Sequence, residues 1–286
     1  ANNNTAVGES ALRANTTGAS NVAVGYFALD ANTTAAGNIA VGASALGANT
    51  TGATNTAIGN EALDANTTAS NNVAVGHSSL GANTTGAENL ASGTLSLATN
   101  TTGSNNVGLG YDALRANTTA SDNTAVGFRS LSSNTTASNN TAVGYLALTA
   151  NTTGSENTAV GGTALDANTT GTNNIAVGYA ALSANTTGFR NVAVGANSGA
   201  LASNTSGSNN VAVGADALRD SSTISDNTAV GYASQRATTS GSNNVSVGSA
   251  SLTNNTTGSD ITAVGRLALD ANTTGVRNTA VGHDTL

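Results

Sequence analysis

The chain has 286 residues, of which 38% are hydrophobic and only 8% are charged, and its formal net charge is −7. It contains no Cys, which excludes a disulfide framework, and no basic stripe that could neutralise the phosphates of a nucleic acid. Low charge without Pro-rich tracts argues against disorder, and no apolar run approaches the length of a membrane span.

A glycine that ends a short Ala-Val-Gly-like run recurs along the whole chain, and fifteen of the sixteen intervals between these marker glycines are 17 residues. The exception is a two-residue insertion near Ser198 and Gly199. A period this short cannot hold two helices, so the sequence predicts an all-β fold. We expect a single-chain parallel β-solenoid, a β-roll or β-helix of seventeen 17-residue coils. It would form one repeat domain over residues 1–286, with no evident caps. The marker glycines are Gly8, Gly25, Gly42, Gly59, Gly76, Gly93, Gly110, Gly127, Gly144, Gly161, Gly178, Gly195, Gly214, Gly231, Gly248, Gly265 and Gly282.

The residues before each marker glycine alternate in size, as in the run Asn-Val-Ala-Val-Gly at 72–76. This period of two predicts a strand with both valines on one face. Leu follows four residues after every marker glycine except at Gln235 and in the coil with the insertion, where it is Leu201. We expect the valines and leucines to form a thin core, and the alanine column that contains Ala74 to face outward, where an oligomer could cover it.

Each coil continues with a segment such as Ala-Asn-Thr-Thr-Gly at 14–18, which starts with strand-compatible residues and ends in turn chemistry. Two asparagine columns follow from the repeat, and stacked amides can bond to one another or to the turn backbone. Two threonine columns follow as well, and because adjacent strand residues point opposite ways, at most one of them can lie on a given outer face. The Asn-Thr-Thr pattern also fits the acceptor of N-linked sugar. The candidate glycan acceptors are Asn15, Asn32, Asn49 and Asn66, with the ladder role as the alternative.

Three aromatic residues, Tyr111, Phe128 and Tyr145, directly follow marker glycines in consecutive coils. We expect their rings to stack. The patch is a candidate contact for a sugar or a partner chain, and the alternative is a surface ladder that stabilises the stack. Charges one coil apart predict two exposed ion pairs, and these are Arg13 with Asp30 and Arg277 with Asp260.

No constellation of catalytic residues emerges from the sequence. There is no Cys nucleophile, and His77 and His283 lack a repeated acidic partner that would orient them. A calcium-binding glycine-aspartate repeat and a phosphate-binding loop are both absent. The sequence therefore predicts a protein that is not an enzyme and has no catalytic residue, metal or cofactor.

The strand motif resembles the head repeats of YadA-type trimeric autotransporter adhesins, and similar repeats occur in phage and bacterial surface fibres. The resemblance rests on the runs at 72–76, 174–178 and 210–214 and covers the whole chain. It implies a β-roll, an extracellular or cell-surface location, and self-association as a homotrimer, with a head-to-tail fibre as another arrangement. It also implies a host-surface, matrix or glycan ligand. The coil here is longer by the Asn-Thr-Thr segment, and the sequence shows neither a heptad stalk nor a membrane anchor.

We therefore expect an extracellular structural and adhesive solenoid that forms a rod-like surface head or fibre segment. The alternative function is ice binding through the stacked threonine columns. The threonines of the Asn-Thr-Thr segment are adjacent, whereas ice binding usually places them at alternating strand positions, and this weakens the alternative. The repeat pattern departs most around residues 214–240, so we expect the fold to open there first. The departures are Ser221, Ile224, Gln235 and Thr238.

Overall fold

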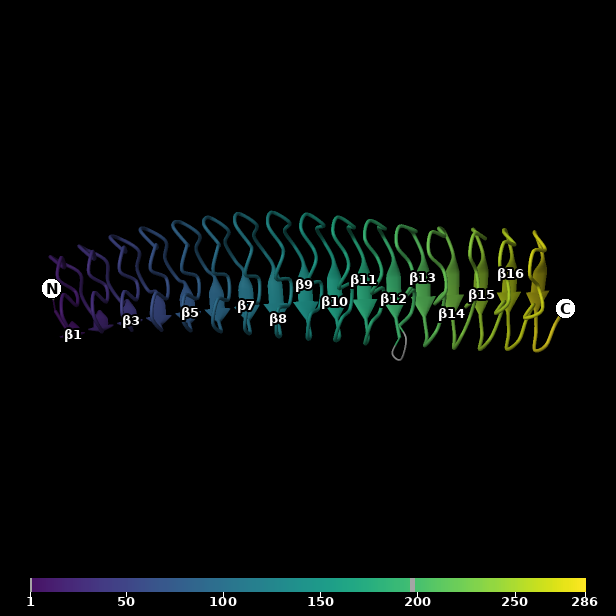
Figure 1. The fold of residues 1–286 in the computed structure, drawn as a ribbon, viewed down its shortest axis with the longest axis horizontal. Helices are drawn as coiled ribbons and strands as arrows, with labels where there is room; N and C mark the ends of the chain where they lie inside the picture. The colour runs from purple at the N-terminus through teal and green to yellow at the C-terminus, as the bar shows by residue number, and fades with distance from the viewer. Residues whose placement is uncertain (1, 196–198) are drawn as a thin grey trace. The chain divides into compact units, whose positions relative to one another are not determined.

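The computed structural model describes residues 2–195 and 199–286, so Ser198 of the predicted insertion lies outside the described residues. Each coil contributes one strand of three residues, and the described residues contain no helix (Figure 1). The strands are β1 (Thr5–Val7), β2 (Val22–Val24), β3 (Ile39–Val41), β4 (Thr56–Ile58), β5 (Val73–Val75), β6 (Leu90–Ser92), β7 (Val107–Leu109), β8 (Thr124–Val126), β9 (Thr141–Val143), β10 (Thr158–Val160), β11 (Ile175–Val177), β12 (Val192–Val194), β13 (Val211–Val213), β14 (Thr228–Val230), β15 (Val245–Val247), β16 (Thr262–Val264) and β17 (Thr279–Val281).

The chain divides into two compact units, residues 1–140 and 141–286. Within the first unit β1 to β8 pair in sequence order, and within the second β9 to β17 do so, always in parallel. The strand register follows the 17-residue repeat, because equivalent residues of successive coils pair, such as Ala23 of β2 with Ala40 of β3. The same register continues across the insertion, where Ala193 pairs with Ala212 and the separation of the paired residues rises from 17 to 19. The predicted all-β parallel solenoid is confirmed.

The strands face the opposite way to the prediction. The middle residue is buried in every strand from β2 to β17, and Ala23 and Ala40 are fully inaccessible, while the flanking valines lie on the outer face. The expected valine core and outward alanine column are therefore wrong. The physical reason is the thinness of the coil, since only a small side chain fits between the strand and the corner opposite it. Gly108 and Ser246, the two residues that replace alanine in this column, are also small and buried.

The leucine column is buried as predicted, and it occupies an unusual backbone conformation. Leu29, Leu46 and Leu114 are fully inaccessible, and each has a φ between 51° and 54°. A leucine in this left-handed region is disfavoured sterically, so the surrounding hydrogen bonds must impose the corner. The Leu29 backbone N–H donates to the oxygen of Ala45 in the next coil at 3.0 Å. Core packing and coil-to-coil hydrogen bonding therefore converge on the same residue.

The Asn-Thr-Thr segments form turns and bends, so the strand-compatible start predicted for them does not become a second strand. Their backbone still bonds from coil to coil, as between the Thr16 N–H and the Thr33 oxygen at 2.9 Å. Asparagine side chains supply hydrogen bonds to one another and to backbone oxygens at this corner. Asn49 Nδ2 donates to Asn32 Oδ1 at 3.1 Å and to the Gly52 oxygen at 2.9 Å. The interpretation of this column as a hydrogen-bonded ladder is confirmed.

A second asparagine ladder runs just before the strands and meets the first one at a shared oxygen. The Asn38 backbone N–H donates to Asn21 Oδ1 at 2.9 Å, and its Nδ2 donates to the Gly52 oxygen at 2.9 Å. Asn38 Oδ1 in turn accepts from the Asn55 backbone N–H at 2.9 Å. Ile261, which interrupts this column, keeps the backbone bond, because its N–H donates to Asn244 Oδ1 at 3.0 Å. Buried amides and backbone thus supply much of the order that the thin apolar core cannot.

Candidate functional site

Each strand directs two side chains outward, one and three positions before the marker glycine, and we call these two columns the outer strand face. Val, Ile and Thr dominate both columns because alternation points them away from the alanine core. Ile175 and Val177 of β11 are 42% and 37% exposed. Contiguous exposed apolar surface is uncommon on monomeric proteins and marks interaction sites. The strongly exposed apolar members are Val7, Ile39, Ile58, Val75, Val160, Ile175, Val177, Val245, Val247 and Val281.

Threonine alternates with valine or isoleucine on the outer strand face of eight strands. In β9 and β10 the pairing places Thr141 beside Thr158 and Val143 beside Val160. Neighbouring strands in a sheet lie about 4.8 Å apart, so hydroxyl and methyl groups repeat at that spacing within each unit. The threonines are Thr5, Thr56, Thr124, Thr141, Thr158, Thr228, Thr262 and Thr279.

The two threonine columns of the Asn-Thr-Thr segments differ in exposure. Thr33, in the first column, is half-buried, and its Oγ1 donates to the Thr50 oxygen at 3.2 Å. Thr34, in the second column, is exposed, and so are its counterparts Thr51 and Thr68. The second column is therefore the more exposed one, while hydroxyls of the first column donate to the next coil even where their residues are exposed, as at Thr16 and Thr205.

The aromatic residues predicted to stack are all exposed at the positions that follow marker glycines. The rings of Tyr111 and Phe128 are stacked, with centroids 5.5 Å apart and an interplanar angle of 12°. They are 48% and 43% exposed, and Tyr145, which follows β9 in the second unit, is 58% exposed. Two of the three rings thus form a small flat platform on the surface of the first unit.

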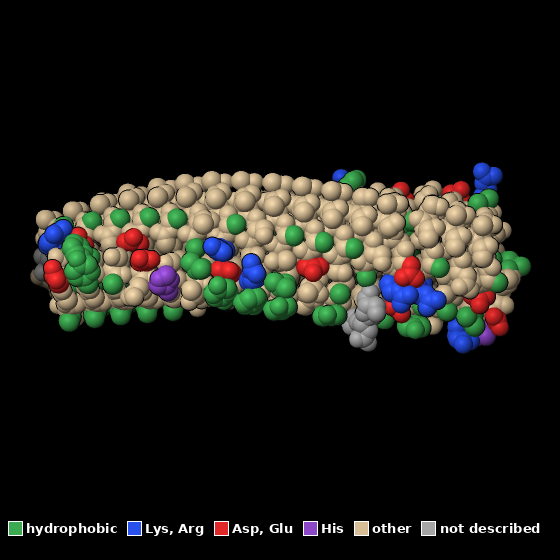
Figure 2. Space-filling view, viewed as in Figure 1, with side chains coloured by type: hydrophobic (Ala, Val, Ile, Leu, Met, Phe, Trp, Pro, Cys, Tyr) green, Lys and Arg blue, Asp and Glu red, His purple; other side chains and the backbone are tan. Residues whose placement is uncertain are grey.

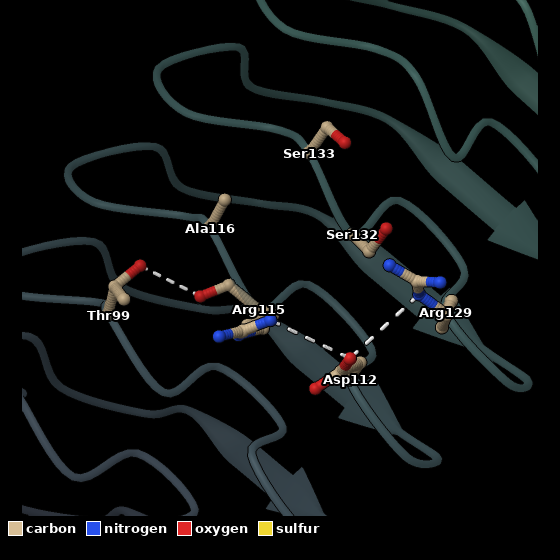
Figure 3. A pocket seen from close by; sticks show the side chains of 7 residues that line it. All are labelled: Thr99, Asp112, Arg115, Ala116, Arg129, Ser132 and Ser133. Carbon is tan, nitrogen blue, oxygen red and sulfur yellow. Dashed lines mark hydrogen bonds and ion pairs between the residues drawn. The ribbon is translucent and has the colours of Figure 1, made fainter.

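The residues that directly follow Tyr111 and Phe128 line a surface cavity of about 410 Å³, which we call the Asp112 cavity (Figure 3). The Asp112 side chain is only 5% exposed and has half-exposed arginines on both sides. Its Oδ2 lies 3.8 Å from Arg115 Nη1 and 3.8 Å from Arg129 Nε. Thr99 Oγ1 donates to the Arg115 backbone oxygen at 2.7 Å. The cavity is lined by Thr99, Asp112, Arg115, Ala116, Arg129, Ser132 and Ser133.

Sequence periodicity did not single out this cluster. The available signal was the charge at variable positions, because Asp112 and Arg129 both stand two residues after a marker glycine in successive coils. Those positions adopt the left-handed backbone region, with φ of 55° and 52°, which turns the two side chains toward the same part of the surface. Charged side chains in Figure 2 gather in small separate groups of this kind and form no continuous stripe.

The other charged groups are simpler. Arg13 Nη2 donates to Asp30 Oδ2 at 3.0 Å, which confirms that predicted pair. Arg277 and Asp260 form no ion pair, because Asn243 Nδ2 donates to the Asp260 carboxylate instead. Across residues 2–195 and 199–286, no group of three or more His, Cys, Asp or Glu side chains is arranged to hold a metal.

A second surface cavity, of about 330 Å³, is lined in part by Glu61 and Asp64. Burial raises the pKa of the Asp64 carboxyl, and the negative charge of Glu61 raises it further. Ser78 Oγ donates to Glu61 Oε2 at 2.9 Å, and His77 Nε2 lies 3.9 Å from the same oxygen. The side chains of His77 and Glu61 are more than half exposed, and Asp64 and Ser78 are half-buried, so this group has the character of a solvated charge cluster.

The candidate glycan acceptors lie in the first asparagine ladder. Asn32, Asn49 and Asn66 are fully inaccessible, and Asn15 is half-buried at the first rung of the ladder. Asn66 Nδ2 donates to Asn49 Oδ1 and to the Ala69 oxygen, both at 3.0 Å. Sugar attachment at an inner rung would therefore require that amide to leave two hydrogen bonds and the interior of the coil.

Comparison of the chain with models of known protein families found no match, and comparison with curated proteins found none either. Over the part of the chain that the structure describes, no helix is long and apolar enough to cross a membrane.

Proposed function

We propose that this protein is a non-catalytic, extracellular β-solenoid that serves as a structural and adhesive segment of a surface head or fibre. The outer strand face carries this proposal. A soluble monomer gains nothing by leaving two columns of Val and Ile in water, whereas burying apolar surface stabilises an assembly by roughly 25 cal/mol per Å². The face recurs with one fixed spacing in coil after coil within each unit, so a second copy of the chain is the partner that matches it best.

Lateral association of two or three copies would cover the outer strand face, which is the arrangement that the resemblance to trimeric adhesin heads suggests. The exposed corners would remain free to contact a host surface, a matrix protein or a glycan. Head-to-tail stacking through the ends of the solenoid would instead leave the outer strand face in solvent. The two modes of self-association are therefore distinguishable by substitution.

Sedimentation velocity of the whole chain tests this proposal. We expect the native protein to sediment as an oligomer and the Val160→Lys/Val177→Lys variant to sediment as a monomer with an unchanged far-ultraviolet spectrum. The matched control is Thr153→Lys/Thr170→Lys, which adds the same charges to an exposed corner column in the same part of the chain. A native protein that stays monomeric over the accessible concentration range contradicts lateral association. Equal behaviour of the two variants contradicts the assignment of the outer strand face.

Ice binding is the second candidate function, and one observation now favours it. Thr141 and Val143 alternate on one strand and both point outward, next to Thr158 and Val160. This is the alternating arrangement that the adjacent threonines of the Asn-Thr-Thr segments lack. Thermal hysteresis separates the two functions, because ice shaping at micromolar protein that disappears in Thr141→Lys/Thr158→Lys would assign the outer strand face to ice. Absence of hysteresis in the native protein removes this candidate.

A further inference from the structure

The Asp112 cavity holds two cations against one anion. Arg115 and Arg129 both approach Asp112 Oδ2, and their side chains are 52% and 50% exposed. A separation of 3.8 Å is too long for a hydrogen bond, so the carboxylate orients the guanidinium groups without occupying their N–H donors. The second oxygen, Asp112 Oδ1, is buried and has no hydrogen-bond partner within the described residues. The local charge is therefore positive on a chain whose net charge is −7.

The other arginine clusters differ from this one. Arg13 donates directly to Asp30, and its guanidinium lies 5.7 Å from the centre of the Phe27 ring. Arg219 donates to the carboxylates of both Asp216 and Asp220. In those clusters the carboxylates equal or outnumber the arginines and take up their donors. Among the described residues, only the Asp112 cavity brings two arginines to one carboxylate.

The planar fork of arginine matches a carboxylate or sulfate oxygen pair in a bidentate manner, and a weakly hydrated guanidinium loses little on giving up water. The cavity is also large enough, since small-molecule sites usually measure about 300–1,000 Å³. Hydroxyl groups of Thr99 and Ser133 stand on its rim. A ligand that carries one anionic group among several hydroxyls would use all of these features.

The stacked rings of Tyr111 and Phe128 directly precede Asp112 and Arg129 in the chain. They do not line the cavity, but each is the chain neighbour of a residue that does, and together they form a flat, half-exposed platform. Aromatic rings of this kind offer apolar area together with low conformational entropy cost, and they commonly receive the flat face of a ligand. A sugar ring has such a face, formed by its C–H groups.

We propose that the Asp112 cavity binds an anionic sugar residue, with its carboxylate or sulfate across Arg115 and Arg129 and an adjoining sugar ring against Tyr111 and Phe128. This inference names the ligand class of the adhesive function proposed above and rests on it. Asp112 acts as a positioning residue that holds the two guanidinium groups apart and pointed outward. Uronic acid polymers and sulfated polysaccharides share this chemistry, and the experiment separates them.

Isothermal titration calorimetry of the whole chain provides the test, with an oligogalacturonate, a heparin-derived oligosaccharide and a neutral maltooligosaccharide of equal length as probes. We expect at least one acidic probe to bind and the neutral one not to bind. Arg115→Gln/Arg129→Gln should weaken the acidic probe at least tenfold, and Tyr111→Ala/Phe128→Ala should weaken it severalfold. Binding should also weaken as salt is raised, because the contact is ionic.

Arg13→Gln is the matched control, because Arg13 stands five residues after its marker glycine, as Arg115 does, but is fully paired. The inference is overturned if no acidic probe binds, if the neutral probe binds equally well, or if Arg13→Gln weakens binding as much as the double variant. Sedimentation of the same samples keeps the two proposals apart. A monomeric protein that binds the acidic probe contradicts only the self-association, and an oligomer that binds no probe contradicts only the sugar site.

Discussion

Gln235 Nε2 donates a hydrogen bond of 3.1 Å to Ser246 Oγ, and both residues break the repeat. Gln235 occupies the leucine column and Ser246 the alanine column, and both are fully inaccessible. The amide also donates to the Thr228 oxygen at 2.9 Å. The buried amide nitrogen is therefore satisfied, whereas Gln235 Oε1 is buried with no hydrogen-bond partner in the described part of the chain.

The two substitutions should be energetically coupled. Ser246→Ala alone should lower the free energy of unfolding, because it removes a partner of the buried amide. The same change in a Gln235→Leu background should raise it, because no amide remains and the alanine–leucine pattern is restored. We expect Gln235→Leu/Ser246→Ala to exceed the native protein by about 1–3 kcal/mol, the cost of a buried unsatisfied group. Chemical denaturation of the four proteins measures this cycle, and an equal effect of Ser246→Ala in both backgrounds would contradict it.

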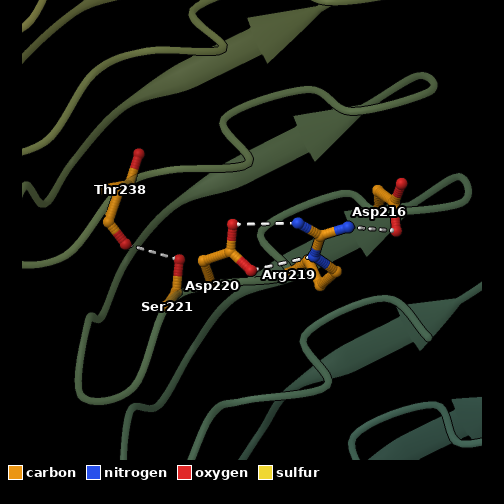
Figure 4. A network of polar contacts seen from close by, with 5 residues as sticks. All are labelled: Asp216, Arg219, Asp220, Ser221 and Thr238. Carbon is orange, nitrogen blue, oxygen red and sulfur yellow. Dashed lines mark hydrogen bonds and ion pairs between the residues drawn. The ribbon is translucent and has the colours of Figure 1, made fainter. Parts of the chain in front are cut away.

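The first asparagine ladder has a gap of two rungs at Ser221 and Thr238 (Figure 4). Ser221 Oγ donates to the Thr238 backbone oxygen at 2.7 Å, so it no longer reaches back to the preceding rung. Asn204 Oδ1 and Thr238 Oγ1 are consequently buried without partners among the described residues. We expect amide hydrogens of residues 214–240 to exchange faster than those of residues 144–178, where the ladder and core are regular.

Restoring the ladder should remove that difference. Ser221→Asn/Thr238→Asn should slow exchange over residues 214–240, because each new amide can donate to the rung before it. Ser222→Asn is the control, since it adds the same side chain at the exposed neighbouring position. Hydrogen exchange followed by mass spectrometry reports both regions in one sample. Uniform exchange along the native chain would contradict the prediction that the gap in the ladder weakens the fold at residues 214–240.

Arg219 and Arg236 stand at the same offset in successive coils, where like charges would repel, but the charge of Arg219 is locally compensated. Its Nε donates to Asp220 Oδ1 at 2.8 Å and its Nη1 to Asp216 Oδ1 at 3.2 Å, as Figure 4 shows. The hydrogen bonding that Arg219 donates to the Asp220 carboxylate is the main reason that the pKa of Arg219 is raised. The departures at 214–240 therefore leave buried polar atoms without partners in the asparagine and leucine columns. On the surface, the charge of Arg219 is compensated by neighbouring carboxylates.

The period, the strand positions and the leucine column of this fold could all be predicted from the sequence, but the facing of the strand could not be predicted from hydropathy. In the run Val22-Ala23-Val24 the larger apolar residues are the obvious core, and they are outside. A size constraint was the better signal. The central column holds only Ala, Gly108 and Ser246, whereas the flanking columns range from Ser to Leu.

The candidate site was only partly accessible to the same reasoning. The stacking of Tyr111 on Phe128 follows from their equal offsets in neighbouring coils. The approach of Arg129 to Asp112 also lies within one column, two residues after successive marker glycines. The approach of Arg115 does not follow from the repeat, because Arg115 stands five residues after its marker glycine and reaches Asp112 from another column. Repetition predicts contacts within a column, whereas the site also uses a contact between columns.

Asp64 should make stability depend on pH. Its pKa is raised by burial and by Glu61, so the folded state holds the proton more tightly than the unfolded chain does. The contribution is fully present below the unfolded pKa of about 3.9 and is lost as pH rises through the folded pKa. Asp64→Asn should therefore stabilise the protein at neutral pH, by less than about 1 kcal/mol because the site is partly solvated. The gain should vanish near pH 3.

Thermal unfolding of Asp64→Asn at pH 3 and pH 7 checks this dependence, with Glu9→Gln as an exposed control. The gain from Asp64→Asn should be smaller in a Glu61→Gln background, because the repulsive charge is already absent. A gain at pH 3 as large as that at pH 7 would show that ionisation of Asp64 is not its cause.

The marker glycines should tolerate no side chain, because two constraints coincide there. Gly25 has a φ of 136°, and a Cβ on it would lie 2.5 Å from the oxygen of Gly42 in the next coil. Gly37 offers a matched comparison, since its φ of 72° is also positive but its nearest contact would be Thr54 Cγ2 at 3.5 Å. Gly37→Ala should cost about 1–2 kcal/mol from the backbone alone.

Gly25→Ala should cost well above 4 kcal/mol, because the backbone oxygen that it meets belongs to the ladder and cannot move without breaking neighbouring hydrogen bonds. Chemical denaturation of both variants measures the difference. If Gly25→Ala and Gly37→Ala lose similar stability, the positive φ alone explains why glycine is needed at the marker position. Close approach of successive coils would then not set the 17-residue register.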